Sequence, residues 1–446
     1  MPITLSVNRL KVKDGNIYKG ISAVGEDAQL NYTTPEIYGA IGDGIVDDTQ
    51  AWQDAIDSGL PVLALGKTYK CGKLTVTKDA DIDCGMASFI CTDSILFDCY
   101  GTAETGTEEA DYTAFGDYTL SDTFTGIAYI LGTNNIFKQR SGYVGGSVEH
   151  FYNGKMDTVI PIDITGVTVY RLNTIQVNIR NISNVTFETT LGALIIKQVY
   201  CAYSVISNVN MTNVCYSVVY LNKCFKCTYR DSHFDIPRYG SYATNYYPVL
   251  VGNSCYTLVE NIYGRAEGWH CIDTGGSTLC RKTRVANCEL YTDYPIPSYF
   301  DHENGIETVL ENCIMSSAGV SCLGRIINCD IHCDKDYSNC CVLVEGSSVE
   351  GLAKYIIENC RFYPQSSNAE IMLHCSPYEA GVSYDYYMDN VKIINCESLN
   401  PDYPLVVSDK FASAITGQKT IKDIYVINSE LTVTAVPQNT YVFPEI

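Results

Sequence analysis

Acidic side chains gather with aromatic and imidazole side chains between residues 246 and 303. The four acids whose spacing suggests a site are Glu267, Asp273, Asp293 and Asp301. Two carboxyl groups that face each other can hydrolyse a glycosidic bond, at about 5–5.5 Å with retention of configuration or about 6.5–9.5 Å with inversion. These four residues are therefore the candidate catalytic residues, and hydrolysis of a glycosidic bond is a reaction that a pair of them could carry out.

Side chains that could hold a sugar lie next to these acids in the sequence. Aromatic rings offer an apolar face and a polar edge, which suits stacking on sugar rings. The alternative is that these residues only decorate the surface or pack locally, because a chain with 51 Asp and Glu brings some acids together by chance. The candidate substrate-binding residues are Trp269, His270, Tyr246, Tyr247, His302 and Glu303.

A polysaccharide lyase would use other groups from the same region. It needs a base such as Tyr or Arg and a cation that neutralises the uronate carboxylate. Arg265, Arg281, Lys282 and Arg284 are available for the second role. We favour a glycoside hydrolase over a lyase, and a protein that only binds the glycan remains the alternative to both.

The charge of the chain argues against two classes of partner. Its 30 Lys and Arg against 51 Asp and Glu give a formal net charge of −21, which repels phosphate backbones and anionic lipids. No stretch approaches the roughly 20 apolar residues that span a bilayer, and MPITLSVNRLKVK at the start lacks the apolar segment of a signal peptide. We expect neither nucleic-acid binding nor membrane insertion.

A short motif repeats along the second half of the chain: an apolar pair, a spacer, Asn, often Cys, then a polar and an apolar residue. Clear copies are RVANCEL (284–290) and IIENCRF (356–362). The copies are about 27 residues apart on average, and periods of 20–50 residues indicate a solenoid. They align on Asn184, Asn208, Asp231, Asn261, Asn287, Asn312, Asn328, Asn359, Asn395 and Asn428.

The residues after each Asn alternate between polar and apolar types, which is typical of a half-buried strand. Asn suits the turn before that strand because it tolerates the left-handed backbone region. The sequence predicts an all-β, single-stranded parallel β-helix in which the Asn side chains stack on one another. A column of thiols should lie just inside them, formed by Cys288, Cys313, Cys329, Cys360 and Cys396.

The front of the chain predicts a cap for this solenoid. A glycine-rich turn precedes Asp47, Asp48 and Thr49, which suit a helix start, and Trp52 lies on the apolar face that follows. A short capping α-helix is expected near 47–58, because the first coil of a solenoid exposes its core to water. The nearby acids do not follow the ligand order of an EF-hand, so no metal site is predicted. No cofactor is assigned, and an assisting calcium ion stays open.

The motif Gly39-Ala40-Ile41-Gly42-Asp43-Gly44, followed by Asp47-Asp48-Thr49, resembles the first coil of pectate-lyase-like right-handed β-helix proteins, particularly bacteriophage tailspikes. The resemblance implies a homotrimer, a bacterial surface glycan as partner, attachment to other phage tail proteins, and a place in the virion tail after synthesis in the host bacterial cytoplasm. The chain departs from the polygalacturonase series of motifs, since its Asp47-Asp48 pair lies in the capping segment.

Three segments follow from these observations. Residues 1–34 resemble a leader that joins a phage tail protein to the virion, or that contacts the other subunits of a trimer. Residues 35–431 form the β-helix, with an irregular insertion near 101–150 where Gly, Thr, Asp and Tyr interrupt the strand pattern. Residues 432–446 form a tail. The expected function is binding of a bacterial surface polysaccharide during host adsorption, and whether the protein also cleaves it stays open. The alternative is a receptor-binding or structural tail protein with the same β-helix and no catalytic activity.

Overall fold

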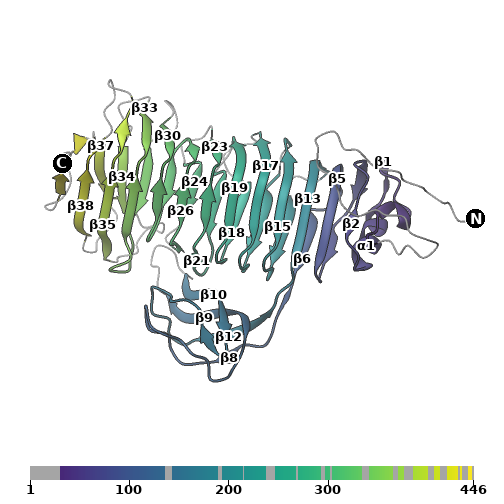
Figure 1. Ribbon diagram of the computed structural model, residues 1–446, viewed down its shortest axis with the longest axis horizontal. Coiled ribbons are helices and arrows are strands. Elements are labelled where there is room, and N and C mark those ends of the chain that lie inside the picture. Colours follow the sequence, from purple (N-terminus) through teal and green to yellow (C-terminus); the bar gives the residue numbers. More distant parts are fainter. Residues whose placement is uncertain are drawn as a thin grey trace, which may run out of the picture.

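Stacked coils of parallel β-strands make up most of the molecule and form a rod (Figure 1). The computed structural model describes residues 31–135, 143–188, 193–213, 215–237, 247–267, 270–292, 297–301, 304–333, 341–364, 370–375, 385–399, 406–411, 419–429, 432–433 and 440–443. In this part of the chain two parallel sheets run along the rod, and short bridges close a third side. The predicted β-helix is therefore confirmed.

The long sheet holds twenty of the described strands. They are β1 (Asp43–Asp47), β2 (Val62–Leu63), β3 (Thr68–Cys71), β5 (Ala80–Cys91), β13 (Val177–Phe187), β15 (Val205–Met211), β17 (Thr228–Ile236), β19 (Leu258–Ala266), β22 (Arg284–Ala286), β23 (Glu289–Thr292), β26 (Val309–Glu311), β27 (Ile314–Met315), β29 (Arg325–Ile327), β30 (Asp330–Cys333), β32 (Lys354–Glu358), β33 (Arg361–Pro364), β35 (Tyr386–Ile394), β36 (Glu397–Ser398), β38 (Lys419–Ile427) and β40 (Thr440–Phe443).

The second sheet holds twelve described strands: β4 (Leu74–Val76), β6 (Ile95–Tyr100), β14 (Leu194–Val199), β16 (Ser217–Asn222), β18 (Val249–Gly252), β20 (Ile272–Gly275), β24 (Tyr299–Asp301), β28 (Ala318–Val320), β31 (Val342–Glu345), β34 (Glu370–Cys375), β37 (Val406–Phe411) and β39 (Thr432–Val433). On the third side β21 (Cys280–Arg281) pairs with β25 (Gly305–Ile306). Strands β39 and β40 pair with β37 and β38, so the coils continue beyond residue 431.

The core consists of columns of apolar side chains, one residue from each coil. In the column that starts at Val259 every residue is at most 1% exposed. Burial of apolar side chains along the whole rod is the main stabilising contribution to such a fold. The column continues through Val285, Leu310, Ile326, Ile357, Ile393 and Val426.

The predicted Asn stack is present at a sharp turn in the long sheet. Apart from Asn184, each residue on which the repeats align has a positive φ, for example +53° at Asn359. The Asn359 amide donates to the Oδ1 atom of Asn328 at 3.2 Å and accepts a hydrogen bond from Asn395 at 3.1 Å. In one coil the predicted position is wrong, because Asn181 occupies the turn and bonds to Asn208, whereas Asn184 lies three residues further along β13.

The predicted thiol column is also present. Cys288, Cys313, Cys329, Cys360 and Cys396 are free thiols and at most 2% exposed. Sulfur atoms donate to the backbone of the preceding coil, as Cys313 Sγ does to the carbonyl of Val285 at 3.6 Å. Cys341, by contrast, is disulfide-bonded.

The first coil is closed by a short 3₁₀ helix, η1 (Pro35–Tyr38), and by α1 (Thr49–Asp57). Trp52 of α1 is fully buried and lies 5.1 Å from the Tyr69 ring and 5.3 Å from the Phe89 ring. The Asp48 carboxylate accepts hydrogen bonds from the backbone N–H groups of Ile41 and Gly42. Asp48, the residue before α1, therefore holds the glycine-rich turn against the capping helix.

A separate antiparallel sheet is inserted between β6 and β13 and lies beside the rod (Figure 1). We call residues 102–173 the inserted domain. It is longer than the insertion expected near 101–150, and regular, because its strands bury a hydrophobic core that also includes Leu279, Ile306, Cys322 and Leu352 of the rod. Its strands are β7 (Thr102–Ala103), β8 (Thr107–Glu108), β9 (Gly126–Asn135), β10 (Val144–Tyr152), β11 (Lys155–Met156) and β12 (Thr168–Asn173).

The inserted domain packs on the third side of the rod. Ile127, Tyr129 and Val148 form one apolar cluster with Phe225 and Cys255 of that side. The backbone contributes as well, because the N–H of Leu279 donates to the carbonyl of Gly146 at 3.0 Å. The inserted domain therefore covers the third side of the rod and not the outer faces of the two long sheets.

Candidate functional site

Asp273 lies on the outer face of the second sheet. Its neighbours on β20, Ile272 and Thr274, are fully buried in the interior, and successive side chains of a strand point to opposite faces. Asp273 is paired in register with Leu250 of β18 and Phe300 of β24. It is only 3% exposed, so it is an outward but sheltered carboxyl group.

Asp301 lies on the inner side of the same sheet. It is fully buried and accepts a hydrogen bond from the hydroxyl of Thr274, which also contacts Tyr299 of the core. A Cβ atom at Gly305 would collide with the Asp301 carboxylate. The structure therefore does not bring Asp301 together with Asp273, and an enclosed side chain cannot face a glycan on the outer surface.

Glu267 lies immediately after β19, at the end of the outer face of the long sheet. Its backbone N–H donates to the carbonyl of Ile236 at 3.1 Å, and its side chain is half-buried. The register of β19 and β23 pairs Ala266 with Thr292, the last described pair before Asp293. Asp293 itself lies outside the described residues, as do Trp269, Tyr246, His302 and Glu303.

Aromatic rings surround Asp273 at the corner where the long sheet leads into the second sheet. His270 stacks on Phe300 with ring centroids 4.7 Å apart, and Tyr247 lies 6.2 Å from His270 on a similar plane. The ring of Tyr216 meets Tyr247 edge-on at 6.2 Å. Burial, and secondarily the charge of Asp273, raises the pKa of Tyr216. We call Tyr216, Tyr247, His270, Asp273 and Phe300 the corner cluster.

One member of the corner cluster, His270, is held by a contact that the sequence did not reveal. His270 Nδ1 lies 2.6 Å from the carbonyl oxygen of Pro297, which orients the imidazole ring. His270 and Phe300 are only 5% and 6% exposed, whereas Tyr247 and Tyr216 are half-buried. The tyrosines are therefore the members of this cluster that an external ligand can reach.

A second group of aromatic side chains lies on the outer face of the long sheet, on the strands that follow the Asn turn. His233 and Tyr263 have ring centroids 5.1 Å apart, and Tyr263 and Tyr291 are 6.1 Å apart. His332 stacks on Tyr363 at 4.3 Å, almost parallel. We call these five residues the outer aromatic face. Tyr263 is its most exposed ring, at 42%.

The outer aromatic face was missed by sequence reasoning, although a signal was present. Its members lie two or four residues after the turn residue of their coil, where the motif requires a polar or outward-pointing side chain. Charged groups lie among the rings, including Glu289 and the Asp330–Arg361 ion pair. Arg265, between Tyr263 and Glu267, is on the same face.

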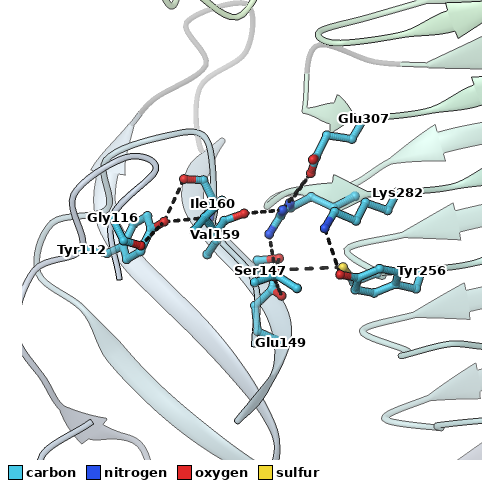
Figure 2. A network of polar contacts seen from close by, with 12 residues as sticks. Tyr112, Gly116, Ser147, Glu149, Val159, Ile160, Tyr256, Lys282 and Glu307 are labelled. Atoms are coloured by element: carbon cyan, nitrogen blue, oxygen red, sulfur yellow. Dashed lines mark hydrogen bonds and ion pairs between the residues drawn. The ribbon is translucent and has the colours of Figure 1, made fainter. Parts of the chain in front are cut away.

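Three of the cations considered for a lyase are held elsewhere. Arg281 is fully buried on the third side and pairs with Glu149 and Glu307 (Figure 2). Lys282 donates to the Tyr256 hydroxyl at 2.9 Å, and Arg284 pairs with Glu311. These contacts place Arg281 and Lys282 on a different side of the rod from Glu267 and Asp273.

The described residues contain no group of three or more His, Cys, Asp or Glu side chains arranged to hold a metal ion. No helix in the part of the chain that the structure describes is long and apolar enough to span a membrane. What the arrangement offers is an elongated outer surface on which aromatic rings lie among carboxylates and cations.

Comparison with solved structures identifies the same fold in several phage proteins. No protein-family model matches the sequence, and no curated protein is similar to it in sequence. The gp54 tailspike of Acinetobacter baumannii bacteriophage AP22, solved in complex with A. baumannii capsular saccharide, superimposes with a TM-score of 0.66 and 11% identity. That match covers 92% of this chain and 76% of the tailspike.

Two tailspikes of Pseudomonas phages are similar to the same degree. The phi297 tailspike gp61 has a TM-score of 0.63 and 16% identity over 93% of this chain and 76% of its own. The LKA1 tailspike gp49 has the same TM-score and identity, and its match covers 91% of this chain and 83% of its own. The chain therefore has a right-handed parallel β-helix fold, as these three phage tailspikes do.

Proposed function

We propose that this protein is a tailspike-type subunit that binds a bacterial surface polysaccharide through its outer aromatic face. The observation that carries the proposal is the row of rings along the long sheet, on a fold shared with a tailspike solved with capsular saccharide. The proposal includes assembly as a homotrimer, attachment to other tail proteins and a location in the virion tail.

The geometry of this face favours a long polymer over a single sugar. Neighbouring coils are about 4.8 Å apart, so rings on coils from His233 to Tyr363 are spread along the rod axis. Each half-buried ring offers one apolar surface to a sugar, and the neighbouring acids and amides offer hydrogen-bond partners to hydroxyl groups. Many weak contacts along a chain then add up to useful affinity.

The binding test compares rings on this face with an exposed ring elsewhere. Tyr263→Ala and Tyr291→Ala should each weaken binding to purified host capsule, by about fivefold or more, because each removes a stacking surface. Tyr152→Ala is the matched control, since Tyr152 is 69% exposed on the inserted domain. Equal affinity of all three variants and the parent protein would refute the proposed surface.

Cleavage of the bound polysaccharide is the second candidate function, and it rests on Glu267 and Asp273, which lie on either side of the corner. Glu267→Gln and Asp273→Asn should each abolish the appearance of new reducing ends, while Asp117→Asn, on the inserted domain, should not. Absorbance from unsaturated uronates would indicate a lyase instead. Binding without either product would leave a receptor-binding protein that does not cut.

A further inference from the structure

The turns on either side of the third face carry an unusual set of side chains. At these turns the backbone adopts positive φ, between +50° and +58°, at non-glycine residues including Tyr203, Lys226, Tyr256 and Lys282. Each of these four donates its backbone N–H to the next coil at 3.0 Å. The residues are therefore stacked directly above one another, in the order Tyr, Lys, Tyr, Lys.

The stacked side chains interact as cations over rings. Lys226 Nζ lies 5.6 Å from the centroid of the Tyr256 ring, and Lys282 Nζ lies 4.7 Å from the same ring. Lys226 is also 5.9 Å from the Tyr203 ring. Two ammonium groups from different coils thus share one aromatic ring, and the Lys282 ammonium also donates to the hydroxyl of that ring (Figure 2).

A second stacked turn adds another cation to the same side. Lys223 Nζ lies 4.4 Å from the ring of Tyr129, which belongs to the inserted domain, and 5.7 Å from the ring of Tyr200. Burial lowers the pKa of Lys223. We call Tyr200, Tyr203, Lys223, Lys226, Tyr256 and Lys282 the lysine–tyrosine strip.

None of the three lysines of this strip forms an ion pair with a carboxylate of the described residues. The carboxylates on this side contact other groups: Glu149 and Glu307 share the guanidinium of Arg281, and Asp157 lies 2.6 Å from His150 Nδ1. In a chain with a net charge of −21, these three ammonium groups and Arg281 together outnumber Glu149, Glu307 and Asp157, so this side carries a local excess of positive charge. An anion bound there would remove their mutual repulsion.

We infer that the lysine–tyrosine strip is a second binding site, selective for an acidic saccharide. The ammonium groups would contact the carboxylate of the sugar, and the exposed ring of Tyr203, at 47% exposure, would stack on its apolar face. A strip that offered only cations would bind any anion, whereas rings alternating with cations fit a ligand that carries both a charge and a ring. This site is independent of the proposed function, because it shares no residue with the outer aromatic face or the corner cluster.

The test titrates the whole protein with tetragalacturonate by calorimetry at low salt. Maltotetraose serves as a neutral saccharide, and inorganic phosphate serves as an anion without a sugar. Lys226→Gln should weaken tetragalacturonate binding about three- to tenfold, and Lys226→Gln with Lys282→Gln should weaken it further. Lys155→Gln is the control, because Lys155 is exposed in the inserted domain, away from the strip.

Three further results decide the inference. Binding of tetragalacturonate should fall steeply between about 50 and 500 mM salt, since partly exposed charges are screened. Tyr203→Leu should reduce binding of tetragalacturonate but leave phosphate unaffected. No detectable binding, an equal loss in Lys155→Gln, or phosphate binding as tight as tetragalacturonate would each overturn the inference, whatever Tyr263→Ala does to binding of host capsule.

Discussion

The ion-pair network around Arg281 is the contact most open to a quantitative test, because it joins the inserted domain to the rod. Arg281 is fully buried, and the side chain of Glu149 is 1% exposed. The guanidinium donates to Glu149, to Glu307 at 3.0 and 2.7 Å, and to the carbonyl of Val159 at 2.7 Å. We expect that Arg281→Met leaves the Glu149 carboxylate buried without its cation.

The expected cost follows from the burial of each partner. Breaking a buried pair by removing one partner costs about 3–5 kcal/mol, so Arg281→Met should lower the free energy of unfolding by that amount. Glu307 is 30% exposed, and water screens its interaction, so Glu307→Gln should cost about 1 kcal/mol or less. Combining Arg281→Met with Glu149→Gln should recover about 1–2 kcal/mol, because the isolated buried charge is gone.

The measurement is guanidinium unfolding followed by far-UV circular dichroism, with limited proteolysis to report release of the inserted domain. Arg281→Met should make that domain sensitive to protease before the rod unfolds. If Glu307→Gln were as destabilising as Arg281→Met, or if the double variant were less stable than Arg281→Met alone, the assignment of the cost to a buried Glu149 charge would be refuted.

Three other perturbations have defined outcomes. Asn359→Ala should lower the free energy of unfolding, measured with guanidinium, by about 2 kcal/mol, because it removes two amide hydrogen bonds and strains a left-handed backbone. Asn359→Gly should lower it less, because glycine adopts that backbone without strain. Equal losses of stability in the two variants would contradict the backbone argument. Burial raises the pKa of the Cys91 thiol to about 11, so the folded protein holds this thiol in its protonated form. The stability that this thiol contributes is complete below about pH 9, where the thiol of the unfolded chain is also protonated, and is lost as the pH rises towards 11. The thermal midpoint of unfolding should therefore be lower at pH 10.5 than at pH 7 and 9, and this decrease should be smaller in the Cys91→Ala variant than in the parent protein. Trp52→Ala should cost about 3–5 kcal/mol and expose the first coil to a hydrophobic dye, whereas the exposed Gln50→Ala should change stability little.

The repeat carried most of what could be predicted about the fold. Asn and Cys at fixed positions predicted both the amide stack and the thiol column, because each position has one structural use in every coil. The error at Asn184 has a simple cause. Asn181 and Asn184 both lie in the segment NISNVTF (181–187), and only the backbone conformation distinguishes the turn residue from a strand residue.

The candidate site was less predictable, because it depends on which way each side chain points. Asp273 and Asp301 look equivalent in the sequence, yet Asp273 points outward and Asp301 points into the core. Successive side chains of a strand point to opposite faces, so the direction of each one depends on the residue at which the strand begins. The role of Arg281 was hidden for another reason. Its partner Glu149 is 132 residues away in the chain, in a domain that sequence periodicity does not place.

The docking of the inserted domain has a consequence for how the chain is made. The domain ends at residue 173, but the surface it covers includes residues as far along as Leu352. At about 5–20 residues per second, a ribosome needs roughly 10–40 s to supply that surface. Ile127 and Val148 pack with Phe225 and Cys255, which are made earlier, so that part of the domain surface is covered first. The part that packs with Leu279, Ile306 and Leu352 stays exposed on the nascent chain until the later coils are translated.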